Sequence, residues 1–441
     1  MSAQQVRISA IHLEGNLKTR DLIIYRELPF QSGDTIQKSD LTGLLELSKN
    51  QLVNLNLFNE VLVTSDSSDF FKVKVHIKLT EKWYLWPIPT LEYADRNVNQ
   101  WYSFKLNPER LNYGLYNFRY NAFGLNHTFK LALIHGYTRN YGFEYRIPYW
   151  DKKRQWGSSF QASRRLNHEI VYATAHNRQQ FYKDPDRDVN RRSSISGSLF
   201  FRPKMFTRFH LNAGLYHQQV SDTVLKLNPD FSRGGINFSL IYIGLGVHYQ
   251  KTDNQYYPTK GIMAGSTLSV NRLPETYQNW IEVSAWGEHY KPLLAKVSHG
   301  LFVGGRLRNR ISIPYPLTSA LGYKYYVRGF EPYVIEGNNF ILIKSEFRYD
   351  LIKNKLLNTG FIPLKNYKKT ITSSQLTFFS DAGYVSPGRN VVNYNDLSSK
   401  WMAGVGLGWN WVFYFDKVVR FEYSVNHTGD FLGNLHFTKS F

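Results

Sequence analysis

The sequence predicts a mainly β protein, a 16-stranded antiparallel transmembrane β-barrel preceded by one small α+β domain. Of the 441 residues, 42% are hydrophobic and 16% aromatic, yet mean hydropathy is −0.40, so apolar and polar side chains must alternate. No apolar run approaches the roughly 18–20 residues that a transmembrane helix needs. A closed barrel is the other structure that satisfies its own backbone within lipid. From Trp83 onwards, segments of about ten residues alternate between apolar and polar residues, as strands between lipid and a polar lumen do.

Residues 1–82 predict the small α+β domain. Its expected elements are a strand, two helices and two strands, at 6–13, 20–28, 39–57, 60–65 and 70–78. Thr19 is the expected N-cap of the first helix, because its hydroxyl can accept a bond from a free backbone N–H. This part carries as many acidic as basic residues, so the net charge of +20 lies in residues 83–441.

Residues 83–441 predict the barrel through the number and spacing of their alternating segments. The sixteen expected strands lie near 86–95, 112–121, 127–137, 141–149, 156–166, 194–203, 207–218, 236–250, 261–271, 279–290, 299–311, 339–350, 375–385, 401–412, 418–427 and 434–441. Short links interleave with long ones, as short periplasmic turns and longer extracellular loops do in outer-membrane barrels. Two links depart from this rule, a short one at 139–140 and a long one at 351–373.

Charged residues share one face of several expected strands. On strands 339–350 and 418–427 these residues are Lys344, Glu346, Arg348, Asp350, Arg420 and Glu422. On strand 375–385, the same alternation places Phe379, Asp381 and Gly383 on one face. That face must line the lumen, because an ionised aspartate against lipid is costly.

Two short motifs make the prediction more specific. The first is Val327-Arg328-Gly329-Phe330, within the longest expected loop, residues 312–338. The second is Phe379-x-Asp381-x-Gly383, on the thirteenth expected strand. In this order, behind a small α+β domain, they resemble the signature motifs of the BamA/TamA-type POTRA-plus-barrel outer-membrane superfamily. The resemblance implies that the loop folds back into the lumen.

The chemistry of the two motifs fits such a loop. Arg328 at the loop tip can reach Asp381 as a bidentate, charge-assisted pair, and Phe379 offers its ring to the guanidinium. Gly329 permits a tight tip with positive φ, and Gly383 leaves room for it. We expect Arg328→Ala or Asp381→Ala to weaken the barrel, and reversal of the two charges to restore part of the loss.

The resemblance also implies a function. Members of this superfamily insert, assemble or translocate proteins at the bacterial outer membrane, and residues 1–82 would be a single periplasmic POTRA-like domain that receives clients or accessory periplasmic or lipoprotein subunits. The first barrel strand would meet the last one, with Leu435, Phe437 and Phe441 on one face, at a weak seam that templates an incoming strand. Insertion and export stay open, and a gated pore or dedicated secretion channel of the two-partner type is the alternative.

Enzymatic chemistry finds no support in the residues. The chain has no cysteine and no Gly-x-Ser-x-Gly nucleophile elbow. The glycines Gly404, Gly406 and Gly408 lie in an aromatic strand rather than before a helix, so small residues on a barrel face explain them better than a nucleotide loop. We expect no enzyme activity, cofactor or metal site.

The basic charge leaves two interpretations. It suits the anionic head groups of an outer membrane, including lipopolysaccharide, or nucleic acid. We expect lipid and no nucleic acid; the alternative is a soluble basic β protein. Residues 1–5 lead straight into a strand pattern without a signal peptide, which we expect to have been removed.

Overall fold

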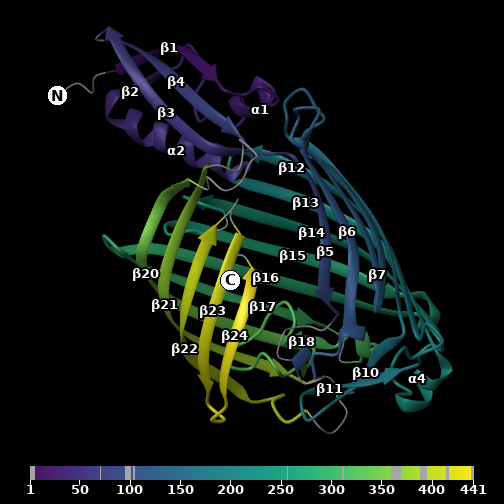
Figure 1. The fold of residues 1–441 in the computed structure, drawn as a ribbon. Coiled ribbons are helices and arrows are strands. Elements are labelled where there is room, and N and C mark those ends of the chain that lie inside the picture. The colour runs from purple at the N-terminus through teal and green to yellow at the C-terminus, as the bar shows by residue number, and fades with distance from the viewer. Residues whose placement is uncertain are drawn as a thin grey trace.

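The computed structural model describes residues 5–69, 71–94, 101–102, 105–255, 257–309, 312–358, 369–387, 395–413 and 417–438. They form a four-stranded sheet, a 16-stranded sheet and two small two-stranded sheets. Figure 1 shows the four-stranded sheet and its helices above one end of the large sheet. Within the described ranges, no helix has the length and apolar character required to cross a membrane.

The small domain comprises β1 (Gln5–Glu14), α1 (Asp21–Tyr25), β2 (Thr35–Gln37), η1 (Lys38–Asp40), α2 (Leu41–Asn54), β3 (Phe58–Asp69) and β4 (Lys72–Glu81). Its strand order is β2-β1-β4-β3, with β1 parallel to β4. Ile8, Leu52 and Val75 are completely buried in its core. The apolar residues of α2 therefore cover one face of the sheet, as their helical spacing predicts.

Two details of this domain differ from the prediction. Residues 29–37, between the two expected helices, were expected to form a loop but contain β2. The N-cap of α1 is Arg20 rather than Thr19. The Thr19 hydroxyl donates to Glu81 Oε1 (2.6 Å) and accepts from Asn121 Nδ2 (2.8 Å). The Thr19 hydroxyl, which the local sequence predicts to cap the helix, therefore contributes to a contact between the domain and the barrel.

The large sheet confirms the predicted fold class, with sixteen antiparallel strands. They are β5 (Leu85–Tyr93), β6 (Leu111–Ala122), β7 (His127–Gly136), β8 (Thr138–Ile147), β9 (Trp156–Asn167), β12 (Asn190–Lys204), β13 (Thr207–Val220), β14 (Asn237–Thr252), β15 (Gly261–Leu273), β16 (Gln278–Leu294), β17 (Val297–Arg308), β20 (Asn339–Asn358), β21 (Lys369–Ser386), β22 (Trp401–Phe413), β23 (Lys417–Asn426) and β24 (Phe431–Thr438). The order along the sheet begins at β24 and ends at β5. In Figure 1 the sheet curls so that β12 to β16 lie at the back and both edge strands at the front.

The large sheet has an apolar outer face, and its most polar lumenal face lies along β20 to β23. On β21, Leu376 and Phe378 point outward and are 47% and 51% exposed, whereas Phe379 and Asp381 point inward and are 0% and 1% exposed. The alternation has the period of two that the sequence predicts. The long expected link at 351–373 is shorter in the structure, because β20 and β21 extend to Asn358 and Lys369.

Additional short elements lie in the connections between the barrel strands, and those labelled in Figure 1 lie toward the end opposite the small domain. They are β10 (Glu169–Ala175), β11 (Arg178–Lys183), η2 (Pro108–Arg110), α4 (Asp222–Leu227), η3 (Pro274–Thr276), η4 (Tyr315–Leu317), β18 (Ser319–Leu321) and β19 (Ile335–Glu336). Val224, Phe231 and Ile313 belong to an apolar core that joins several of these loops. The sequence predicts only a loop where the β10–β11 hairpin lies.

Candidate functional site

The loop of residues 312–338 carries a tight turn at its buried tip. Phe330 N donates to Val327 O (3.0 Å), and between them Gly329 has a φ of +93°, which favours glycine. Val327 and Phe330 are each 1% exposed and pack with Leu321 in one apolar cluster. The turn thus presents Arg328 to the barrel wall between two anchored apolar side chains.

Arg328 is completely buried and pairs with Asp381 on β21. Its Nε lies 2.8 Å from Oδ2 of Asp381, and its Nη2 lies 2.7 Å from Oδ1. The Arg328 backbone N also donates to Oδ2 (3.1 Å), and the guanidinium lies 3.8 Å from the centre of the Phe379 ring. The structure therefore brings these three residues of the two motifs together in the bidentate geometry of a strong charge-assisted pair.

Two further carboxylates contact the same guanidinium, and no motif in the sequence connects them to it. Nη1 of Arg328 lies 2.5 Å from Oε2 of Glu346 on β20 and 3.3 Å from Oε1 of Glu422 on β23. Alternation had placed both glutamates on the polar faces of their strands. The missing information was the register, which sets Lys344 opposite Asp381 and Gly408 opposite Glu422 and so aligns these faces across four strands.

Each of the three carboxylates also has a cation from the wall itself. Nε of Arg348 lies 2.7 Å from Oε1 of Glu346, Nη1 of Arg420 lies 3.5 Å from Oε1 of Glu422, and Nζ of Lys344 lies 3.9 Å from Oδ2 of Asp381. We call these seven residues the lumen lock: Arg328, Lys344, Glu346, Arg348, Asp381, Arg420 and Glu422. Mutual pairing is what makes burial of so many charges tolerable.

Glycines on the wall leave the space that the loop tip fills. A Cβ added to Gly404 would lie 1.9 Å from the Arg328 carbonyl oxygen, and one added to Gly383 would lie 2.7 Å from Cγ2 of Val327. A Cβ on Gly406 would lie 2.5 Å from Cζ of Phe379. The glycine repeat that resembles a nucleotide loop is therefore explained by close packing in the lumen.

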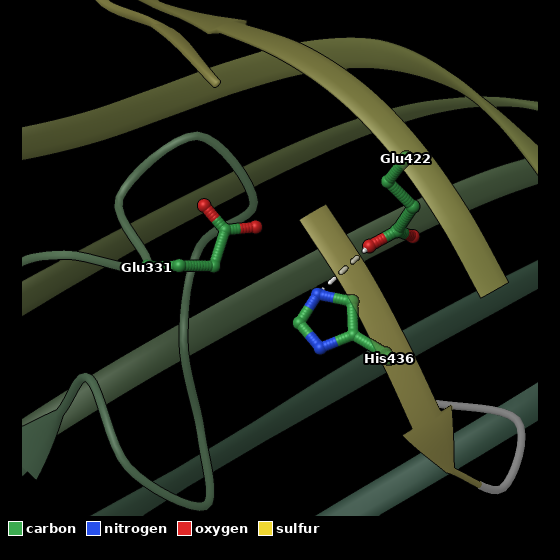
Figure 2. Close-up of side chains that lie close together, drawn as sticks. All are labelled: Glu331, Glu422 and His436. Carbon is green, nitrogen blue, oxygen red and sulfur yellow. Dashed lines mark ion pairs between the residues drawn. The ribbon is translucent and has the colours of Figure 1, made fainter. Parts of the chain in front are cut away.

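One group of potential metal ligands lies beside the lumen lock. Figure 2 shows Glu331 from the loop, Glu422 from β23 and His436 from β24, whose ligand atoms lie within 4.8 Å of one another. The dashed line joins Nε2 of His436 to Oε2 of Glu422, 3.4 Å apart. Glu422 already contacts Arg328 and Arg420, and their positive charges oppose a cation there. That no metal binds stays a prediction.

The expected seam residues lie on or beyond β24. Leu435 is on the outward face and 38% exposed, as its parity predicts. Phe437 belongs to the same strand, and Phe441 lies outside the described residues. The first barrel strand, β5, is the other edge of the sheet, so the structure places the two expected seam strands at its two ends.

A second buried arginine joins the small domain to the barrel, a contact that the sequence does not predict. Arg202 on β12 contacts both carboxylate oxygens of Glu27, just after α1, with Nη1–Oε1 and Nη2–Oε2 distances of 2.5 and 2.7 Å. Nearby, Arg26 Nε donates to the Arg154 carbonyl (3.0 Å), and Arg154 Nη1 donates to the Leu22 carbonyl (2.9 Å). No local pattern marks these residues, because Arg202 lies near the end of a strand and the others lie in an ordinary turn or in the short helix α1 and its end.

Comparison with known proteins agrees with this architecture. Residues 121–415 match the Omp85 superfamily domain, and residues 6–82 match the POTRA family, described as the surface antigen variable number repeat. No curated protein matches the chain.

Three solved structures resemble the fold. BamA from Haemophilus ducreyi lacking POTRA domains 1–3 has a TM-score of 0.54 at 16% identity, covering 98% of this chain and 83% of that one. CdiB from Escherichia coli has a TM-score of 0.54 at 13% identity, covering 98% of this chain and 75% of that one. CdiB from Acinetobacter baumannii has a TM-score of 0.50 at 16% identity, covering 98% of this chain and 73% of that one. At these identities the likeness concerns the fold alone.

Proposed function

The chain belongs to the Omp85 superfamily, whose members insert or translocate proteins at the outer membrane, and on this premise we propose that it inserts client β-strands at the seam between β5 and β24. It is an outer-membrane protein with a periplasmic POTRA domain. Insertion needs neither nucleotide nor cofactor, because burial of the client's apolar face and pairing of its backbone supply the free energy.

The lumen lock is the observation that favours insertion over export. A chain that passed through the lumen would have to displace Arg328 from three carboxylates, all within a buried network. Beyond it, the loops around Phe231 and Ile313 share an apolar core at the far end of the barrel. A strand that enters at the sheet edges would leave both features in place. Export through a two-partner-type channel is the second candidate, supported by the CdiB-like fold.

The small domain would deliver clients or accessory subunits. Its two sheet edges are β2 and β3, and β3 is the longer of the two. An extended segment can add to such an edge through main-chain hydrogen bonds. The anionic lipids and lipopolysaccharide of the membrane are the remaining proposed partners, and we propose no nucleic acid and no enzymatic activity.

Reconstitution tests the proposal. The full chain is placed in phosphatidylcholine vesicles, a urea-unfolded outer-membrane β-barrel is added, and its folding is followed by the heat-dependent shift in gel mobility. We expect faster folding than with vesicles holding an unrelated porin. Protease-protected unfolded reporter inside the vesicles, without faster folding, would instead support export. If neither occurs, the proposed function is wrong.

A further inference from the structure

The two edge strands at the seam differ in the backbone groups that they offer to a partner. On β5, two hydrogen bonds determine which groups face β6: Tyr120 N donates to Tyr84 O (2.7 Å), and Ala94 N donates to Arg110 O (2.8 Å). Both bonds obey the register of the β5–β6 pair. Because successive residues direct their N–H and C=O groups to opposite sides of a strand, even-numbered residues of β5 face β6 and odd-numbered residues face the seam.

Prolines occupy the two central seam-facing positions of β5. The odd-numbered residues are Leu85, Pro87, Pro89, Leu91 and Tyr93. Proline has no backbone N–H, so the middle of this edge offers carbonyl acceptors and no donor. Neither proline weakens the pairing with β6, because their positions are those whose backbone groups point away from it.

The edge of β24 has no such gap. Asn426 N donates to Asp430 O (3.1 Å), in the register of the β23–β24 pair. Even-numbered residues of β24 therefore face β23, and the odd-numbered ones, which include Phe431, Leu435 and Phe437, face the seam. Phe431, Leu435 and Phe437 are not prolines, so each has both a backbone donor and a backbone acceptor.

We infer that an incoming strand pairs with β24, and that Pro87 and Pro89 exclude it from β5. A strand placed on β5 would have carbonyl groups opposite the prolines without a donor, and an unsatisfied carbonyl in hydrocarbon is costly. Prolines on sheet edges are a known means of preventing strand addition. The inference rests on the proposed function and specifies which of the two edges acts as the template.

The occupant is an extended strand of an outer-membrane protein. On β24, Leu435 faces outward whereas Asn434 and His436 face the lumen. A strand that continues this sheet must repeat the alternation, with apolar side chains toward lipid and polar ones toward the lumen. The chain's own residues 431–441 have this alternation except at Leu432 and Lys439, and they serve as a probe of known sequence.

Disulfide capture tests the inference, and the absence of cysteine from the chain removes background. Peptides of residues 431–441, each with one cysteine at a different position, are added to vesicles that hold the full chain with either Leu435→Cys on β24 or Leu91→Cys on β5. Both sites lie on the outward face and are exposed. We expect at least about tenfold more capture at position 435, because the β5 edge cannot complete the ladder. A peptide with the sequence of β24 could pair with β5 by taking the place of β24 in the barrel. The choice of probe therefore favours capture on β5, against the expected result.

Substitution of the prolines provides the second test. Pro87→Val with Pro89→Val supplies the missing donors, so capture at Leu91→Cys should rise to the level seen on β24. Pro292→Val, a barrel proline on β16 away from the seam, should leave it unchanged. Preferential capture at position 91 with both prolines present would overturn the inference. The inference would also be overturned if the protein accelerates folding of the reporter barrel but captures the peptide at neither position. Loss of that acceleration in the unsubstituted chain would instead refute the proposed function, whichever edge binds the peptide.

Discussion

Two buried arginines attach other parts of the chain to the barrel wall, and they do so differently. Arg328 brings a loop to the wall and contacts three carboxylates and the face of Phe379. Arg202 belongs to the wall and contacts one carboxylate, Glu27, together with two neutral acceptors, the Tyr149 hydroxyl (2.6 Å) and the Met205 carbonyl (2.7 Å).

The difference concerns what happens when each contact is broken. Removal of Arg328 would leave three carboxylates in a fully buried cluster with only the cations of the wall. Separation of Glu27 from Arg202 would expose both groups to water at the periplasmic end, where each can be hydrated. Buried ion pairs are costly to break chiefly when the remaining charge cannot reach water. The loop is therefore built to stay in place, whereas the small domain can detach.

Arg328→Ala should have the largest effect. We expect a loss of about 3–5 kcal/mol in barrel stability, because the buried carboxylates of Asp381 and Glu422 would be left with wall cations only at 3.9 and 3.5 Å. The measurement is the temperature at which the compact gel form is lost, with Arg187→Ala in an exposed loop as the control. An unchanged transition temperature would show that the lumen lock does not stabilise the barrel.

Charge reversal sharpens the same comparison. The sequence alone predicts that Arg328→Asp with Asp381→Arg restores part of the loss. The structure changes that expectation, because the new carboxylate at position 328 would face Glu346 and Glu422. We now expect no restoration in the heat-modifiability assay; recovery would mean that the pair acts independently of the two glutamates.

Gly404→Ala attacks the loop tip without removing a charge. The added Cβ would lie 1.9 Å from the Arg328 carbonyl oxygen, a backbone atom that cannot simply rotate away. We expect a loss of about 2–3 kcal/mol from overpacking in the same melting assay. Gly197→Ala on β12 is the matched control, since its nearest neighbour would be 3.7 Å away. Equal behaviour of the two variants would contradict the tight fit of the loop.

Glu27→Gln should affect the small domain and leave the barrel intact. The amide keeps the shape but loses the charge, so we expect the docking to weaken by about 1–2 kcal/mol. Hydrogen exchange of α1 should become faster, while the melting of the barrel should not change. Glu46→Gln on the exposed face of α2 is the control. A lowered barrel transition would mean that this contact also supports the wall.

The parts that the sequence predicted depend on local periodicity and short motifs. A period of two assigns every residue of a strand to one of two faces, so Asp381 could be placed in the lumen before any neighbour was known. The two motifs then identified Arg328 as its partner. Both steps need only the order of residues along one strand and one loop.

The parts that escaped prediction depend on register and docking. Glu346 and Glu422 were on the correct faces, but only the pairing of four adjacent strands brings them to Arg328. The contact between Glu27 and Arg202 spans 175 positions in the chain and requires the orientation of a whole domain. Likewise, two backbone hydrogen bonds were needed to show that Pro87 and Pro89 face the seam.

The smallest effect concerns pH at the base of the inserted loop. Burial raises the pKa of Glu336, in β19, to about 7. The folded chain therefore holds a proton that the unfolded chain releases at lower pH, so this stability is present at acidic pH and declines as pH rises through 7. We expect a loss of roughly 1 kcal/mol between pH 6 and pH 7. It should appear as a lower melting temperature in the parent protein and disappear in Glu336→Gln. Identical pH profiles for the two proteins would show that Glu336 is already ionised, and loop docking would then depend on the lumen lock at every pH.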